Sequence, residues 1–244
     1  MEKTVIIIPA RYASTRLCGK LLKEVNNKPI IQWVWEAAKK SKLADEVIIA
    51  TDSELILEKA QSFGARVEMT SKDHKSGSDR ICEVAKRHNE YNFILNMQGD
   101  EPQITPEVID LAISTLVEND CDISTLVRQI TQEEQIQDPN CVKCVFDNDF
   151  NALYFSRCPI PYERNKGEAK YYAHIGIYGY RRDSLIKMTS LEQSDLEKAE
   201  SLEQLRALKN GMKIKVALTT LNPIGIDTQR DLDKFKNISE NKAN

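Results

Sequence analysis

The chain has 244 residues, of which 41% are hydrophobic and 29% charged, and its formal net charge is −3. This composition argues against intrinsic disorder and against a nucleic-acid-binding protein, which usually carries a basic excess. The first apolar run, Val5–Ile8, ends at Pro9 and is too short to cross a membrane or to act as a signal peptide. We therefore expect a cytoplasmic globular protein that contacts neither nucleic acid nor membrane.

The six cysteines fit that compartment as free thiols. Cys141 and Cys144 form a C-x-x-C pair, a spacing that also occurs in zinc and redox sites. A zinc site needs a second pair of ligands with similar spacing, and the sequence has none. The pair also lies in an apolar, strand-like run, so the favoured interpretation is structural.

The first hundred residues alternate between strand-like and helix-like segments. Thr4–Ile8 is a continuous β-branched run, as in a buried strand, and Pro29 suits the first turn of a helix. The further elements expected here are strands at 47–50, 66–69 and 93–97 and helices at 54–63 and 79–86. Gly64 is suited to close the first of these two helices. This alternation predicts βαβ units and a mostly parallel, Rossmann-like α/β sheet.

The second half of the chain changes character. The elements expected there are strands at 141–146, 152–155, 175–180 and 213–219 and helices at 196–209 and 228–235. The first two strands are typical of a hairpin around Asn148-Asp149. The 159–171 stretch is charged and aperiodic and predicts an exposed loop. We therefore expect a single domain, 1–244, with a smaller antiparallel subdomain inserted at about 123–182.

In parallel α/β sheets, ligands bind at the carboxyl ends of the strands. The loop after the first strand carries Arg11, Arg16 and Lys20, a density of donors that suits a phosphate chain. It is not a Walker loop, because Leu21 stands where a metal-binding Ser or Thr would follow the Gly-Lys pair. The G-x-G-x-x-G fingerprint is absent too, which disfavours NAD and FAD. A solvated basic loop is the alternative that stays open.

A second segment of this kind places Asp100 and Glu101 directly after the fourth strand. Carboxylates there can hold a hard cation such as Mg²⁺ next to a nucleotide phosphate. Asp227, which also follows an apolar run, is the candidate for a second carboxylate ligand. Two alternatives stay open: the acids are surface groups without a metal, or Asp227 is the N-cap of the final helix.

Polar and aromatic side chains that suit a small polyhydroxylated acid gather in the second half. They are Arg157, His174, Tyr178, Glu203 and Arg206. His174 and Tyr178 share one face of a strand by period-two alternation, and Glu203 and Arg206 share one side of the 196–209 helix. A lone histidine is more often structural, but a histidine together with arginine, tyrosine and glutamate side chains indicates a pocket.

Together these segments resemble the 3-deoxy-manno-octulosonate cytidylyltransferases, also called CMP-Kdo synthetases. The matching stretches, in family order, are IIIPARYASTRLCGKLL, ATDSE, TSKDHKSGSDR, LNMQGDEP, PNCVKCVFD, ALYFSRCPIP, HIGIYGYR, LEQLRALKNGMKIKV and GIDTQRDL. The resemblance implies an α/β nucleotidyltransferase fold with an antiparallel dimerisation insert, and hence a homodimer. It also implies Mg²⁺-dependent transfer of the cytidylyl group of CTP to the anomeric hydroxyl of 3-deoxy-manno-octulosonate (Kdo). The products would be pyrophosphate and CMP-Kdo, for lipopolysaccharide biosynthesis.

The resemblance also assigns roles to residues by position. The nucleotide-binding residues would be Arg11, Arg16, Lys20, Ser78 and Arg80. The catalytic residues would be Lys20, Asp100 and Asp227, and the two aspartates would bind Mg²⁺. The sugar acid would be held by Gln98, Arg157, His174, Tyr178 and Glu203.

Three departures from the family pattern bear on these roles. Cys18 and Leu21 replace the prolines that usually flank the Gly-Lys pair, which is expected to loosen the loop and weaken CTP binding. Ser78-Asp79 replaces the usual Thr-Glu, a conservative change. The 164–172 stretch is shorter than usual, which leaves the dimer contacts there open.

Two rival functions stay open at this point. The chain could activate a related sugar acid, such as 8-amino-Kdo or a sialic acid, because the sequence does not rank such close analogues. It could instead be a non-catalytic nucleotide sensor, although both acids and all basic residues of the proposed site are present. Pyrophosphate release from CTP, measured with each acid, separates these functions.

Overall fold

The computed structural model describes residues 2–13 and 17–241. The chain forms two compact units, one of Met1–Asp110 with Pro223–Asn244 and one of Leu111–Asn222. Within the described ranges, no helix is both long enough and apolar enough to cross a membrane. All six cysteines are free thiols.

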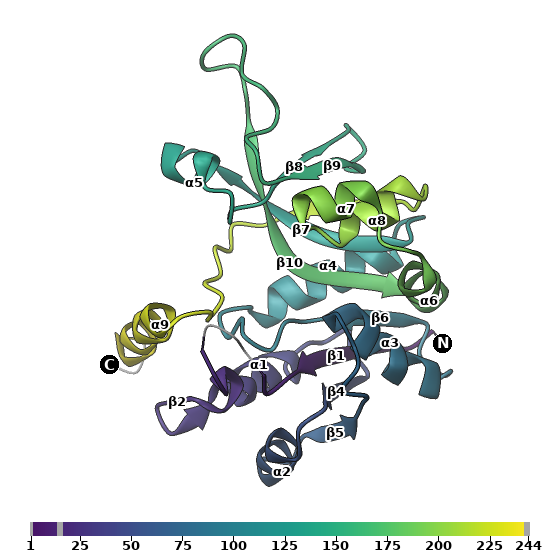
Figure 1. Ribbon diagram of the computed structural model, residues 1–244, viewed down its shortest axis with the longest axis vertical. Helices are drawn as coiled ribbons and strands as arrows, with labels where there is room; N and C mark the ends of the chain where they lie inside the picture. The colour runs from purple at the N-terminus through teal and green to yellow at the C-terminus, as the bar shows by residue number, and fades with distance from the viewer. Residues whose placement is uncertain (1, 14–16, 242–244) are drawn as a thin grey trace. The chain divides into compact units, whose positions relative to one another are not determined.

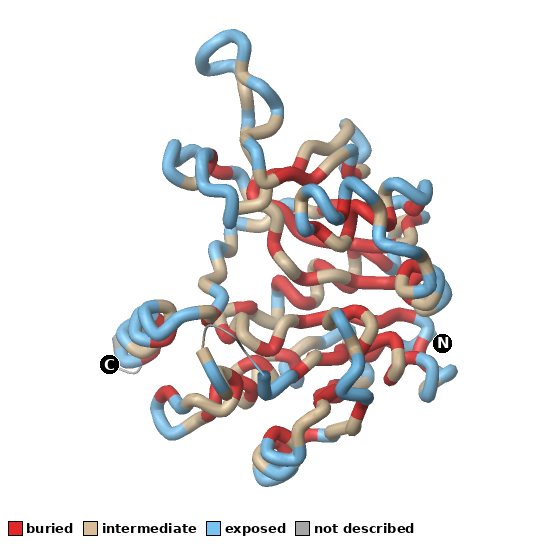
Figure 2. The backbone as a smooth tube through the Cα atoms, in the orientation of Figure 1, coloured by how far each residue is buried: buried red, intermediate tan, exposed pale blue. Residues whose placement is uncertain are grey.

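The first unit contains a parallel sheet of four strands (Figure 1). The strands, in spatial order, are β6 (Phe93–Asn96), β1 (Thr4–Ala10), β4 (Glu46–Thr51) and β5 (Arg66–Met69). The connecting helices are α1 (Ile30–Ala38), α2 (Glu54–Ser62) and α3 (Gly77–Arg87). The β-branched run in β1 is fully buried because helices cover both faces of such a sheet (Figure 2). This confirms the predicted βαβ units.

The same unit ends in α9 (Gln229–Asn241), which is longer than the predicted 228–235 helix. Leu232 and Phe235 on α9 pack against Val25 and Ile30, and the Trp33 and Phe235 rings meet edge to face at 5.7 Å. Val25 belongs to a short hairpin made of β2 (Glu24–Val25) and β3 (Lys28–Pro29). This packing returns the end of the chain to the loop that follows β1. A short 3₁₀ helix, η1 (Lys20–Leu22), also belongs to this unit, whereas α4 (Pro106–Val117) begins in it and ends in the second unit.

The second unit is built on a mixed sheet. Its strands are β7 (Ile123–Ile130), β8 (Lys143–Phe146), β9 (Ala152–Ser156), β10 (Tyr171–Arg181) and β11 (Ile214–Leu218). β10 is antiparallel to β7 and to β8, β8 is antiparallel to β9, and β11 is parallel to β7. The helices are α5 (Glu133–Gln137), α6 (Arg182–Ser190), α7 (Asp195–Glu200) and α8 (Gln204–Lys209). The predicted hairpin is therefore present, and the fold class, α/β with an antiparallel element, is confirmed.

Two features of this unit differ from the sequence predictions. The strand β7 was not expected, because its buried positions include Ser124 and Thr125, which interrupt the apolar pattern of a core strand. The prediction of a single helix at 196–209 is wrong. The helix is interrupted between α7 and α8 at Ser201, whose φ is 52°. A residue in this left-handed conformation ends a helix.

Candidate active site

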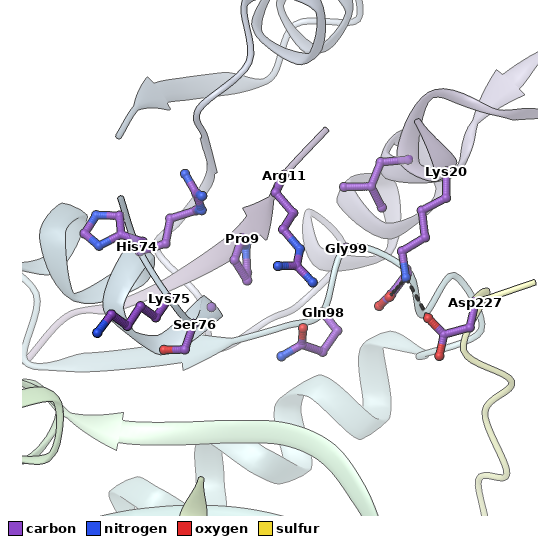
Figure 3. Close-up of a pocket in the computed structure, with 13 residues that line it drawn as sticks. Pro9, Arg11, Lys20, His74, Lys75, Ser76, Gln98, Gly99 and Asp227 are labelled. Carbon is purple, nitrogen blue, oxygen red and sulfur yellow. Dashed lines mark hydrogen bonds and ion pairs between the residues drawn. The ribbon is translucent and has the colours of Figure 1, made fainter. Parts of the chain in front are cut away.

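A polar pocket of about 230 Å³ lies in the first unit, beyond the carboxyl ends of β1 and β6 (Figure 3). Its lining residues are Pro9, Arg11, Lys20, Leu21, His74, Lys75, Ser76, Gly77, Arg80, Gln98, Gly99, Asp100 and Asp227. Parallel strands bring the loops that follow them to one edge of the sheet, which is why segments far apart in the sequence meet here. The predicted residues Arg11, Lys20, Arg80, Gln98, Asp100 and Asp227 all lie in this lining. Ser78 is buried in α3 outside the lining, and Arg16 lies outside the described residues.

The turn after β6 owes its position to Gly99. A Cβ atom at this residue would lie 3.2 Å from the carbonyl oxygen of Pro9 and 3.4 Å from a side-chain carbon of Leu21. Because any side chain would push these neighbours away, glycine lets the turn approach β1 closely. Gln98 and Asp100, on either side of Gly99, are thereby held in the pocket.

The ammonium group of Lys20 lies between two carboxylates. It donates to Asp227 Oδ1 at 2.9 Å and also contacts Asp100 Oδ2 (Figure 3). Burial by itself lowers the pKa of Lys20, but the two carboxylates outweigh this effect and hold that pKa above its usual value. The backbone supports the pair, since the Ile226 amide donates to the Asp100 carbonyl at 2.9 Å. The predicted proximity of Asp100 and Asp227 is therefore present.

Asp227 is not the cap of the final helix. That position belongs to Thr228, whose hydroxyl accepts a hydrogen bond from the Asp231 amide at 3.3 Å. The Asp231 carboxylate in turn accepts bonds from the Thr228 amide at 2.9 Å and from its hydroxyl at 2.7 Å. This reciprocal arrangement is a capping box. The alternative in which Asp227 serves only as an N-cap is therefore wrong.

Glu101 adds a third carboxyl group beside the two aspartates. Burial, and to a smaller degree the charges of Asp100 and Asp227, raise its pKa to about 8. Its Oε2 atom is buried and has no hydrogen-bond partner among the described residues. At neutral pH Glu101 is therefore mainly protonated, and it adds little negative charge to the pocket.

The opposite end of the pocket in this view is formed by the loop before α3 (Figure 3). Ser76 caps α3: its hydroxyl accepts from the Asp79 amide at 3.1 Å, and the Asp79 carboxylate accepts from the Ser76 amide at 3.2 Å. His74 lines the pocket, with its Nε2 in contact with the Glu83 carboxylate. Sequence reasoning assigned no role to His74, although the loop was recognised, because Glu83 lies on a helix that only the fold brings to it.

Arg80 is almost fully buried beneath the pocket. Its guanidinium donates to Asp52 Oδ2 at 2.7 Å, to the Thr70 hydroxyl at 2.5 Å and to the Ser71 carbonyl at 3.4 Å. These bonds join the loops that follow β4 and β5 to the first turn of α3. Arg80 thus supports the pocket as well as lining it.

The remaining predicted sugar-acid residues belong to the second unit. The imidazole of His174 packs edge to face on Phe155 at 5.1 Å and lies 5.2 Å from the Tyr178 ring. Burial lowers the pKa of His174 to about 3, so the ring is neutral at physiological pH. Its Nε2 lies 2.9 Å from the Thr125 hydroxyl, which also lies 2.8 Å from the Ile177 carbonyl and 3.2 Å from the Ile175 carbonyl. In the neutral ring one nitrogen is a hydrogen-bond donor and the other an acceptor.

Arg157 makes contacts that the sequence did not predict. Its guanidinium donates to three main-chain carbonyls, those of Glu200 at 2.6 Å, Pro139 at 2.9 Å and Ser201 at 3.3 Å. A guanidinium has five N–H groups, so two remain for a carboxylate. The predicted binding of a sugar carboxylate by Arg157 stays a prediction, with a structural role beside it.

Glu203 stands at the start of α8, and its Oε1 lies 3.6 Å from the Arg206 guanidinium. The predicted pairing of these two residues on one side is thus present. Arg206 also makes closer bonds to Glu197, at 2.6 and 2.8 Å, and both of these side chains are buried. A two-point contact of this kind joins α8 firmly to α7.

Known proteins match nearly the whole chain. Residues 5–214 match the family described as cytidylyltransferases. A 3-deoxy-manno-octulosonate cytidylyltransferase from Fusobacterium nucleatum is 49% identical over 96% of each chain, and one from Thermodesulfovibrio yellowstonii is 49% identical over 94% of this chain and 95% of its own. A solved CMP:2-keto-3-deoxy-manno-octonic acid synthetase in complex with CTP is 40% identical, covers 99% of this chain and 100% of its own, and has a TM-score of 0.95.

More distant structures share the fold alone. One is a cytidylyltransferase from Leptospira borgpetersenii, which is 20% identical, with a TM-score of 0.66, over 97% of this chain and 86% of its own. The near-full-length matches above confirm the resemblance found in the sequence. This chain belongs to the cytidylyltransferase family, and within it to the 3-deoxy-manno-octulosonate cytidylyltransferases.

Proposed function

We propose that this protein transfers the cytidylyl group of CTP to 3-deoxy-manno-octulosonate and releases pyrophosphate. The observation that carries this proposal is the identity of 49%, over nearly the full length of both chains, with proteins of that name. The polar pocket of the first unit supports it, because its cationic side chains suit a nucleotide triphosphate.

The chemistry needs positioning and charge neutralisation more than covalent catalysis. The anomeric oxygen of the sugar acid forms a bond to the α-phosphorus of CTP, the bond from that phosphorus to the bridging oxygen breaks, and the hydroxyl proton is released. Arg11 and Lys20 would bind the phosphate oxygens and stabilise the negative charge on the departing pyrophosphate. The N-terminus of α3, at Ser76 and Gly77, adds backbone N–H groups to the same pocket.

Asp100 and Asp227 suit Mg²⁺, because two hard oxygen ligands converge on one cationic group, the ammonium of Lys20. A magnesium ion bound by these carboxylates would polarise the phosphate oxygens and lower the pKa of the attacking hydroxyl. Lys20 would then turn from the carboxylates to the triphosphate, its predicted ligand.

The sugar acid would be recognised by Gln98 and by the second-unit residues Arg157, His174, Tyr178 and Glu203. The neutral ring of His174 can form a hydrogen bond to a sugar hydroxyl through Nδ1, and the two remaining N–H groups of Arg157 can bind the carboxylate. We also propose that the protein acts in the cytoplasm.

We further propose a homodimer formed through the strands of the second unit. Two apolar side chains of this region are largely exposed: Leu153 on β9 at 60% and Tyr162 in the following loop at 88%. A second copy of the chain packed against these strands would remove both side chains from water. Light scattering at micromolar concentration should give twice the chain mass, and the mass of a single chain would contradict the dimer.

The activity is tested by incubating the protein with CTP, Mg²⁺ and one acid at a time: Kdo, 8-amino-Kdo or a sialic acid. We expect pyrophosphate release with Kdo. Release with another acid and none with Kdo would show that the substrate is wrong. CTP binding without pyrophosphate release from any of the acids would favour a nucleotide sensor.

A further inference from the structure

Lys143 on β8 is among the largest of the fully buried side chains in the part of the chain that the structure describes. Its ammonium donates to two main-chain carbonyls, that of Arg157 at 2.7 Å and that of Asp138 at 2.9 Å. Within the described ranges, no carboxylate forms an ion pair with it. Burial lowers the pKa of Lys143, which reflects the unfavourable free energy of placing a charge there.

A buried lysine of this kind calls for an explanation beyond packing. An apolar side chain of similar length would fill the same space without desolvating a charge. A lysine is long enough to bring one donor group from within β8 to both carbonyls. The bonds therefore link the loop before β8 to the end of β9.

The register of the sheet places Lys143 beside two predicted sugar-acid residues. Lys143 pairs with Ser156 on β9 and with Ala173 on β10. Arg157 follows Ser156 in the chain, and His174 follows Ala173. The His174 amide donates to the carbonyl of Val142, next to Lys143, at 2.8 Å.

The bond from Lys143 fixes a peptide group from which further contacts extend. The Arg157 guanidinium donates to the carbonyls of Glu200 and Ser201, and the Arg157 amide donates to the Glu200 carboxylate at 2.9 Å. Glu200 is the last residue of α7 and Ser201 is its C-cap, and Glu203, two residues after Ser201, is the N-cap of α8. One chain of hydrogen bonds thus runs from Lys143 through Arg157 to the segment that carries Glu203.

We propose that Lys143 is a positioning residue for sugar-acid binding: by holding the Arg157 carbonyl, it sets the end of β9 and, through the Arg157 guanidinium, the α7–α8 junction that presents Glu203. This inference rests on the proposed function. Lys143 itself is too deeply buried to touch a substrate, so its effect must pass through Arg157.

The test is Lys143→Met, which keeps the length and burial of the side chain and removes the donors. We expect the KM for the sugar acid to rise about tenfold or more, because small misplacements of binding groups weaken positioning strongly. The KM for CTP should stay within about twofold, because the triphosphate residues belong to the other unit. The matched control is Lys187→Met, an exposed lysine on α6 of the same unit, which should change neither KM.

A double-mutant cycle with Arg157→Ala checks the route. If Lys143 acts through the Arg157 guanidinium, adding Lys143→Met to the Arg157→Ala protein should raise the KM for the sugar acid no further. Fully multiplicative effects would overturn the proposal, and so would an unchanged KM in Lys143→Met or an equal rise in both KM values. If circular dichroism shows that Lys143→Met is unfolded, Lys143→Gln, which keeps a shorter donor, takes its place with the same criteria. A wild-type protein that releases no pyrophosphate would instead refute the proposed function itself.

Discussion

Asp100 and Asp227 accept hydrogen bonds from the same ammonium group, that of Lys20, although 127 positions separate them in the sequence. Two carboxylates so close together repel each other, and a cation between them removes most of that repulsion. In this structure the cation is a lysine that also lines the pocket proposed for CTP. Lys20 and a metal ion are thus alternative partners for the same two carboxylates, and the exchange between them can be measured.

Replacing Asp227 by asparagine tests the metal proposal directly. The substitution keeps the shape of the side chain and leaves the Thr228–Asp231 cap untouched, so the melting temperature should change little. Turnover at saturating Mg²⁺ should fall about a hundredfold or more, as when a main electrostatic group of a transition state is lost. Near-normal turnover would show that Asp227 does not hold the metal.

Lys20→Met should separate the two roles of the lysine. Without the ammonium, Asp100 and Asp227 face each other unneutralised, so the affinity for Mn²⁺ in the absence of nucleotide should increase on the order of tenfold. Turnover should fall because a triphosphate contact is lost. Titration of Mn²⁺ followed by electron paramagnetic resonance measures the first effect, and Lys23→Met is a nearby control. Unchanged Mn²⁺ affinity would exclude competition between the lysine and the metal.

Arg157→Ala should have two effects. The KM for the sugar acid should rise while CTP binding stays nearly unchanged, since Arg157 is not in the unit that carries the pocket proposed for CTP. The free energy of unfolding should fall by about 1–3 kcal/mol, because three main-chain carbonyls lose their donor. Kinetics with each substrate varied in turn measure the KM values, and urea unfolding measures the free energy of unfolding. A stability loss without any change in the KM for the acid would leave Arg157 only its structural role.

Ser201 offers a test of the helix break. Its φ of 52° is a conformation that glycine adopts freely and β-branched residues strongly avoid. Ser201→Gly should therefore keep the wild-type stability or slightly raise it, whereas Ser201→Val should lose about 1–2 kcal/mol. Thermal unfolding of both variants checks this order. If Ser201→Val were as stable as Ser201→Gly, the left-handed conformation would not be required.

His174 should make the protein less stable in mild acid. Its pKa is lowered to about 3 by burial in the folded state, whereas an unfolded histidine binds a proton near pH 6.5. Between these values the unfolded state binds more protons, so the contribution of His174 to stability is present above pH 6.5 and is lost as the pH falls. Urea unfolding from pH 7 to pH 5 should show a steeper loss for wild type than for His174→Gln. Parallel curves would mean that His174 titrates alike in both states.

Local sequence patterns are sufficient to predict many of the strands and helices of this protein. The β-branched run at Thr4–Ile8 and the helix opened by Pro29 are properties of neighbouring residues, and the structure contains both. Because strands and helices alternate, the parallel sheet follows, and with it the edge at which Lys20 and Asp100 lie. Motifs spread over the chain also identify the family from the sequence.

Only the tertiary structure decided which distant groups share a contact. Thr228 caps the final helix, whereas its neighbour Asp227 contacts the Lys20 ammonium. The residue types alone do not show which of the two is the cap. At the helix break, the carbonyls of Glu200 and Ser201 accept hydrogen bonds from Arg157, which lies more than forty residues earlier. Local sequence records the preferences of a segment, whereas hydrogen bonds between segments form only when burial makes unpaired polar groups too costly to leave.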